Sequence, residues 1–198
     1  AQGKAEQDPQ YQINADALAQ VQPTDLTASE ISVRLGATWL DKKYIEQFMY
    51  ETFETPRYLR GQIEISYVPY TAEWQVSRKS MVRYNDVAAF TTYGTDRASA
   101  YRLLEDALNL RDIRIYDTIE DADGRERRVL NAKETTLAAQ KQQLIRDAFK
   151  DWIWKDPERR ETLVRQYNEE MNSTRPREYD GSHIVFSGMN PEITLRAV

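Results

Sequence analysis

The feature that most constrains the fold is a long amphipathic segment in the second half of the chain. Asn131 followed by Glu134 has the spacing of a helix N-cap pair, and Asp156-Pro157 resets the chain at the far end. The residues between them predict one helix over about 132–155, roughly six turns at ~3.6 residues each. Its apolar stripe is Leu137, Leu144, Ile145, Ala148, Phe149, Trp152 and Ile153. A further helix follows the short break at once, so the two helices must cross or fold back on each other.

Shorter helices are expected earlier in the chain. Residues 27–30 fit a capping box and predict a helix that runs through Leu35 to a stop at Gly36. Asp41 caps a second helix, which ends at Thr55-Pro56 because the residue before proline is pushed out of the α region. Thr95 or Asp96 caps a third, through Leu108.

Alternating apolar residues predict strands between these helices. Residues 63–76 form one predicted hairpin with its turn at 69–72, and residues 88–92 are a weaker candidate for one more strand. Ile113 and Ile115 begin another predicted strand, Asp123-Gly124 is a tight turn, and the chain returns through Val129 and Leu130. The sequence therefore predicts an α+β fold, with a small antiparallel sheet of hairpins packed with about five helices and an extended C-terminal tail.

The polarity of the chain ends suggests three regions. We expect a polar N-terminal lead-in over 1–24 that has room for a short helix, an α+β domain over 25–172, and an extended tail over 173–198. The tail ends without a polar terminus or a capping residue, which fits a natural domain end and equally a piece cut from a longer chain.

Composition excludes several kinds of chemistry. The 198 residues carry a net charge of −5, with a single His and no Cys. A disulfide framework, a thiolate metal site and a two-His metal motif are therefore excluded, and no metal ligands are predicted. Since no stretch approaches the ~18 apolar residues of a membrane helix, we expect a cytoplasmic protein without a membrane partner.

The residues offer little for catalysis. The glycines are isolated, so neither a phosphate-binding loop nor a nucleophile elbow is present. His183 is the only candidate general base, but a loop His that caps or packs is the better interpretation because no partner is evident. Acidic pairs such as Glu105 and Asp106 are typical of a solvated helix face. No catalytic residue is predicted, and the chain is not expected to be an enzyme by itself.

Arginines beside aromatic residues are the main candidates for a binding function. Such combinations suit contact with a nucleic-acid backbone and stacking on bases. The candidate DNA contacts are Arg78, Lys79, Arg83, Arg125, Arg127, Arg128, Arg175 and Arg177, and the candidate stacking residues are Trp74 and Tyr84. Ordinary surface charge is a strong alternative, because residues 61–130 hold 10 basic and 12 acidic side chains.

A winged helix-turn-helix is a further alternative, with the helix after Asp41 as its recognition helix. That helix carries Glu46, Glu51 and Glu54 against Lys42 and Lys43. An acidic, aromatic-rich helix fits a major groove poorly, so core packing is the preferred interpretation.

Several stretches together resemble one family. They are Leu26–Ile31, Arg34–Trp39, Tyr44–Tyr50, Thr92–Thr95, Leu108–Asp112, Phe149–Ile153, Tyr167-Asn168 and Asn172–His183. In this order they resemble the segment just before the helicase domain of very large bacterial and phage methyltransferase–helicase proteins of mobile elements, which are similar to phage anti-restriction proteins. The resemblance runs from about Gln22 to Arg196, and Ala197-Val198 depart from the family pattern.

The resemblance implies a place between two enzymes. In that family an adenine-specific DNA methyltransferase lies upstream and a Swi/Snf-type ATPase lies downstream. The catalytic motifs of both are absent from this chain, so ATP, Mg and S-adenosylmethionine are expected for the parent protein and no cofactor for this chain.

Two functions follow as hypotheses. The first is a non-catalytic connecting domain that orients the motor and has DNA backbone contact as a candidate role. The second is a purely structural scaffold that docks the flanking methyltransferase and helicase domains, with Ile184, Val185, Phe186 and Ile193 as candidate docking residues.

Overall fold

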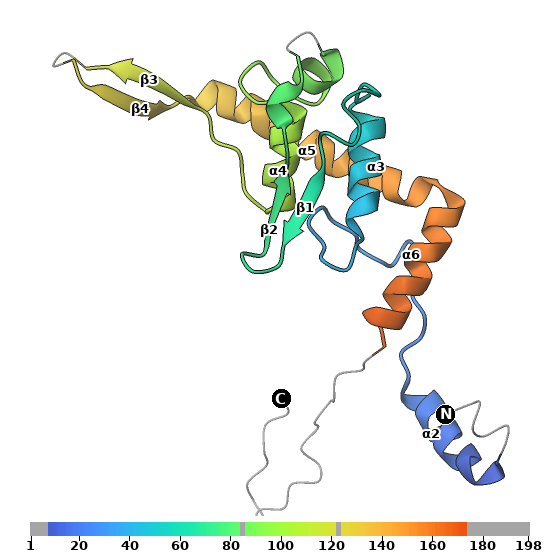
Figure 1. The fold of residues 1–198 in the computed structure, drawn as a ribbon. Coiled ribbons are helices and arrows are strands. Elements are labelled where there is room, and N and C mark those ends of the chain that lie inside the picture. The colour runs from blue at the N-terminus through green and yellow to red at the C-terminus, as the bar shows by residue number, and fades with distance from the viewer. Residues whose placement is uncertain (1–7, 84–85, 122–123, 174–198) are drawn as a thin grey trace, which may run out of the picture. The chain divides into compact units, whose positions relative to one another are not determined.

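A computed structural model describes residues 8–83, 86–121 and 124–173, and it divides the chain into two compact units. The first unit combines Ala1–Leu26 with Gln166–Val198, and the second is Thr27–Arg165. The predicted α+β class is confirmed, with helices beside two separate two-stranded antiparallel sheets (Figure 1). Most of the predicted tail lies outside the described residues.

The first unit contains the short helix for which the predicted lead-in has room. A 3-10 turn, Pro9–Tyr11, leads into helix α2, Gln12–Val21. Asn168 then holds the backbone of Leu26: the Leu26 N–H donates to Asn168 Oδ1 at 2.8 Å, and Asn168 Nδ2 donates to the Leu26 carbonyl at 2.9 Å.

Three helices form the body of the second unit, and a fourth continues from it. They are α3 (Lys42–Thr52), α4 (Ala100–Leu108), α5 (Ala132–Lys155) and α6 (Pro157–Glu170). The predicted caps of α3 and α5 are confirmed, since Asp41 accepts from the Lys43 N–H at 3.0 Å and Asn131 from the Glu134 N–H at 2.9 Å. Asp156 likewise caps α6 ahead of Pro157, by accepting from the Arg159 N–H at 2.7 Å.

Aromatic side chains fill the core between these helices. Phe48 of α3 packs edge-on against Phe149 of α5 with centroids 5.1 Å apart, and Phe53 packs against Tyr101 of α4 at 5.3 Å. The buried hydroxyls of Tyr101 and Thr55 share a 2.7 Å hydrogen bond, and burial raises the pKa of Tyr101 to about 12. Among the described residues, every buried side-chain nitrogen and oxygen has a hydrogen-bond partner.

The first hairpin, β1 (Ile65–Val68) and β2 (Glu73–Val76), confirms the strand prediction and packs one face on the body. Ile65 pairs with Val76 and Tyr67 with Trp74, and three of these four side chains are buried. Its outer edges are covered by polar side chains of α3 and α4 and by Asn109, the C-cap of α4. The covering bonds are Ile65 N–H to Glu46 Oε1, Val76 N–H to Glu105 Oε2, and Trp74 N–H and carbonyl to Asn109.

The helix predicted from 27 to 35 is wrong. The capping-box bond does form, with the Thr27 N–H donating to Glu30 Oε2 at 2.8 Å, and it holds the pKa of Glu30 below its ordinary value. Only one turn follows, because residues 31–34 form neither helix nor strand, and buried and exposed residues alternate from Ile31 to Leu35. A period of two in the apolar residues prevailed over the local cap.

Two other predictions, of one strand and of one helix cap, are wrong. The strand suggested at residues 88–92 is a π-helical turn, Ala88–Thr92, whose carbonyls at Thr91 and Thr92 accept from Lys141 Nζ. Helix α4 starts at Ala100 with Ser99 at its N-cap, so neither Thr95 nor Asp96 caps it. Thr95 instead forms a tight turn with Ala98 ahead of the helix.

The second hairpin consists of β3 (Tyr116–Glu120) and β4 (Glu126–Leu130). Ile113 and Ile115 are buried and lead into its first strand, which begins at Tyr116. The predicted strand is therefore present, but it starts three residues later than predicted. Gly124 in the turn has a φ of +73°, as the predicted tight turn requires.

Candidate functional site

The second hairpin is the part of the second unit that is least covered by protein. Figure 1 shows β3 and β4 extending away from the start of α5. Every described residue of the two strands is exposed except Asp117, which is half-buried, and the strands contact mainly each other. Large apolar side chains are among those exposed: Tyr116, Ile119, Val129 and Leu130.

The strand register assigns the predicted arginines to opposite faces of this hairpin. Thr118 pairs with Arg128 and Ile119 pairs with Arg127, and directly paired residues share a face. What we call the Arg127 face contains Asp117, Ile119, Asp121, Arg125, Arg127 and Val129. The Arg128 face contains Tyr116, Thr118, Glu120, Glu126, Arg128 and Leu130. The three arginines that are neighbours in sequence therefore do not form one cluster.

The two faces differ in charge. On the Arg128 face, Glu120 lies directly opposite Glu126, while the Arg128 guanidinium lies over the Tyr116 ring, 4.9 Å from its centroid. On the Arg127 face, the carboxylate of Asp117 is already bound by a cation of the body, so Arg125 and Arg127 are balanced mainly by Asp121. The Arg127 face is the more cationic of the two.

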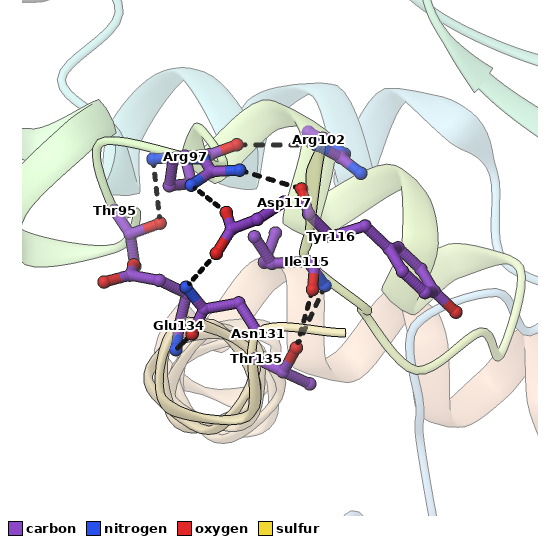
Figure 2. A network of polar contacts seen from close by, with 9 residues as sticks. All are labelled: Thr95, Arg97, Arg102, Ile115, Tyr116, Asp117, Asn131, Glu134 and Thr135. Atoms are coloured by element: carbon purple, nitrogen blue, oxygen red, sulfur yellow. Dashed lines mark hydrogen bonds and ion pairs between the residues drawn. The ribbon is translucent and has the colours of Figure 1, made fainter. Parts of the chain in front are cut away.

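A polar network holds the root of the second hairpin, as Figure 2 shows. Arg97 donates to Asp117 Oδ1 at 2.8 Å and to the Tyr116 carbonyl at 2.9 Å. Asn131, the cap of α5, donates to the other carboxylate oxygen of Asp117 at 2.7 Å. The strand therefore leaves the body at an angle set by side chains from the loop before α4 and from the start of α5.

Asp117 is the centre of this network. The hydrogen bonds from Arg97 and then from Asn131 hold the pKa of Asp117 below its ordinary value of 3.8. One step before the hairpin, Thr135 Oγ1 accepts from the Ile115 N–H at 3.0 Å, which fixes the incoming chain against α5. The network stays charged at neutral pH.

Sequence reasoning missed Arg97 altogether. Its two partners lie 20 and 19 residues away, so no local pattern connects them. The Arg97 N–H also donates to Thr95 Oγ1 at 3.3 Å, which places the residue in the turn before α4.

The other described candidate contacts lie on the chain after β2, and one of them, Lys79, lines a cavity of about 270 Å³ together with Arg97 and Arg102. Arg78 is exposed at the end of β2 with a left-handed φ of 47°, and Lys79 beside it forms an ion pair with Glu105 of α4. Arg83 is exposed and lines a cavity of about 410 Å³ together with Asp86.

The predicted stacking residues fare differently. Trp74 is only 5% exposed and packs on Tyr67 with centroids 4.9 Å apart, so its ring is already covered by protein. Tyr84, Arg175, Arg177 and His183 lie outside the described residues, as do the candidate docking residues Ile184, Val185, Phe186 and Ile193.

Metal ligands and membrane spans were sought over the described ranges. Within 8–83, 86–121 and 124–173, no group of three or more His, Asp or Glu side chains could hold a metal ion. Over the same ranges, no helix is long and apolar enough to cross a membrane.

The chain was compared with known proteins. The family model described as a domain of unknown function (DUF8437) matches residues 34–173, which is more than half of the chain and includes the second hairpin with its root. Neither a curated protein nor a solved structure matches the chain.

Proposed function

The chain belongs to the DUF8437 family of domains of unknown function, and from that premise we propose a non-catalytic accessory module of a DNA-processing protein. In this proposal the second hairpin contacts the DNA backbone, while the body connects a methyltransferase to a helicase motor and orients that motor. ATP, Mg and S-adenosylmethionine would be bound by those neighbouring domains, in the cytoplasm.

The observation that carries the proposal is an exposed two-stranded ribbon on a fixed root. A two-stranded antiparallel ribbon fits the major groove of a duplex, and arginines on its surface can bind phosphates. Arg125 and Arg127 lie two residues apart on the same face, so their Cα atoms are about 7 Å apart along the strand. The root bonds of Arg97 and Asn131 to Asp117 reduce the entropy lost when the ribbon is positioned on a ligand.

Charge limits the strength of this contact. The chain carries a net charge of −5, and Asp121, Glu120 and Glu126 lie on the ribbon itself. Two phosphate contacts give a log–log salt slope of about −1.8, at about −0.9 for each contact. We therefore expect weak binding that is measurable only at low salt and is tightened in the parent protein by the neighbouring domains.

One observation favours the scaffold as a second candidate function. Ile119 and Leu130 are each 48% exposed on opposite faces of the ribbon, and apolar side chains of this size suit a protein partner better than a phosphate backbone. Under this alternative the flanking domains of the parent protein cover the ribbon. Amide protection at Ile119 and Val129 would then rise when the chain is joined to those domains, with or without DNA.

The DNA contact is tested by titrating a fluorescent duplex with the chain at low salt. Changing Arg125 and Arg127 together to Ala is expected to flatten the slope of log affinity against log salt by about 2. The matched control changes Arg57 and Arg160, which are also exposed, and lowers the net charge equally. If the Arg125/Arg127 variant and the Arg57/Arg160 control weaken binding equally, the effect comes from net charge and not from the hairpin. If the chain does not bind the duplex at low salt, the DNA role is wrong and the scaffold function stands.

A further inference from the structure

Three cationic side chains surround a cavity of about 270 Å³ at the root of the second hairpin. They are Lys79, Arg97 and Arg102. They come from three places in the chain: the 3-10 turn after β2, the loop before α4 and the first turn of α4. Cations that converge on one hollow from separate elements are typical of a site for an anionic group, above all a phosphate.

Arg102 supplies the positive charge that the protein does not balance. Its side chain is exposed, and within the described residues its guanidinium bonds only to the Arg97 carbonyl, at 3.4 Å, as Figure 2 shows. Asp106 lies four residues further along α4, yet no carboxylate of the described ranges forms an ion pair with Arg102. Since a guanidinium has five N–H donors, most of them are available to a ligand.

The other two cations are paired with carboxylates that do not line the cavity. Lys79 binds Glu105, whose second oxygen accepts from the backbone of β2 at 2.8 Å. Arg97 binds Asp117, whose second oxygen accepts from Asn131 at 2.7 Å. Because ammonium and guanidinium groups have further donors, Lys79 and Arg97 can bind a ligand while these bonds stay in place.

The rest of the lining fits an uncharged group attached to the anion. Ser80 and Ser99 contribute hydroxyls, and the side chain of Ser99 makes no cap bond at the start of α4. Val82, Phe90 and Ala98 form an apolar wall, against which a base can stack. The volume lies near the lower end of the ~300–1,000 Å³ of small-molecule pockets, so one nucleotide fits better than a larger ligand.

We propose that this cavity binds one nucleotide, with the phosphate at the three cations and the base against the apolar wall. The nucleotide is either free or part of a single strand, because both present the same phosphate and base. The site uses no side chain of β3 or β4, so it is independent of the duplex contact proposed above. Asp96 also lines the cavity and is exposed, and its negative charge lowers the affinity for a phosphate.

The first test is a titration of the chain with deoxyadenosine monophosphate, followed by NMR. Amide shifts are expected at Ser80, Ser99 and Arg102. Deoxyadenosine, which lacks the phosphate, is the matched probe and is expected to bind at least about tenfold more weakly. The proposal is overturned if the monophosphate shifts none of these amides, or if deoxyadenosine binds equally well.

Single substitutions test the role of charge. Arg102→Gln is expected to weaken binding of the monophosphate about tenfold. Asp96→Asn is expected to tighten it about two- to fivefold, and tighter binding cannot result from misfolding. The matched control is Arg160→Gln, which removes the same charge from an exposed arginine of α6 outside the cavity and should change nothing. Equal weakening by Arg102→Gln and Arg160→Gln, or weaker binding by Asp96→Asn, overturns the proposal.

A short strand of oligodeoxyadenylate distinguishes the two sources of the nucleotide. Shifts of the same amides at a lower nucleotide concentration than with the monophosphate would identify a single strand as the ligand. Shifts with the monophosphate alone would identify a free nucleotide, and either result supports the site. Changing Arg125 and Arg127 together to Ala should leave binding of the monophosphate unchanged, so failure of the duplex contact and failure of this site are separate results.

Discussion

The two hairpins of this chain have similar lengths and antiparallel registers but opposite surroundings. In the first, Ile65, Trp74 and Val76 are buried against the body, and Glu46, Glu105 and Asn109 bind the outer edges. In the second, both faces of both strands are exposed, and the bonds to the body gather at the root. An isolated two-stranded hairpin is marginal in water, and the second hairpin adds almost no buried side chains to the body.

This difference separates the parts that stabilise the chain from the part available to a ligand. The first hairpin contributes buried apolar area, whereas the second contributes exposed apolar and cationic side chains on a fixed base. The predictions below test this separation, from the largest expected effect to the smallest.

Truncating one side chain in each hairpin gives the largest contrast. Trp74→Ala removes a buried ring and is expected to lower the free energy of unfolding by about 3–5 kcal/mol. Ile119→Ala removes a side chain that is 48% exposed and is expected to change it by less than about 0.5 kcal/mol. Urea unfolding of both variants measures the difference, and similar losses would mean that the second hairpin is part of the core.

Two glycines at positive φ allow a test of how tightly the body is packed. A Cβ at Gly36 would lie 2.1 Å from the carbonyl oxygen of Leu108, whereas a Cβ at Gly61 meets nothing within 4 Å. Their φ values, +83° and +79°, are alike, so backbone strain cancels in the comparison. Gly36→Ala is expected to cost about 3 kcal/mol and Gly61→Ala about 1 kcal/mol, measured by thermal unfolding. If both substitutions destabilise the chain equally, the backbone at Leu108 of α4 moves aside at little cost in free energy.

The polar contacts of the two hairpins should also differ in effect. Asn109→Ala leaves the Trp74 N–H and carbonyl without their partner and is expected to cost about 1–3 kcal/mol of global stability. Arg97→Ala is expected to cost less than about 1 kcal/mol, because its ion pair with Asp117 is exposed. Its effect should instead appear as faster amide exchange confined to residues 116–130. Exchange that rises throughout the body would contradict this assignment.

The smallest effect is the response of the root to acid. Because the pKa of Asp117 is lowered below 3.8 in the folded chain, its contribution is fully present above that pH and is lost as pH falls through the lowered value. Protection of the root amides is therefore expected to persist to about pH 4 and to decline below it. Asp117→Asn should remove this dependence, and an onset near neutral pH in the unaltered chain would implicate a different group.

Sequence patterns predicted the elements whose signals are local. Asn131 with Glu134, and Asp156 with Pro157, fixed the ends of α5 and α6 because a cap is decided by residues within one turn. At residues 27–35 the same kind of signal gave a wrong prediction. Ile31, Val33 and Leu35 are buried and alternate with exposed residues, and this segment forms no helix.

Features that depend on distant contacts escaped prediction. The wide stripe of α5 was predicted as one face, but only tertiary packing decides that Ile145 is buried and Leu144 is not. Gln142 belongs to the buried stripe because it accepts from the Ile113 N–H and donates to the Arg111 carbonyl, a role without a local signature. Arg125, Arg127 and Arg128 are neighbours in sequence and were predicted as DNA contacts together, but only the strand register shows that they lie on two faces.

The most direct test of the account removes the second hairpin and keeps its root. A two-residue Asn-Gly turn can join Asp117 to Val129, which are paired in the register, in place of residues 118–128. The account predicts a shortened chain whose free energy of unfolding is within about 0.5 kcal/mol of the original and whose binding to duplex DNA at low salt is lost. A shortened chain that fails to fold, or that binds the duplex as well as the original, would contradict it.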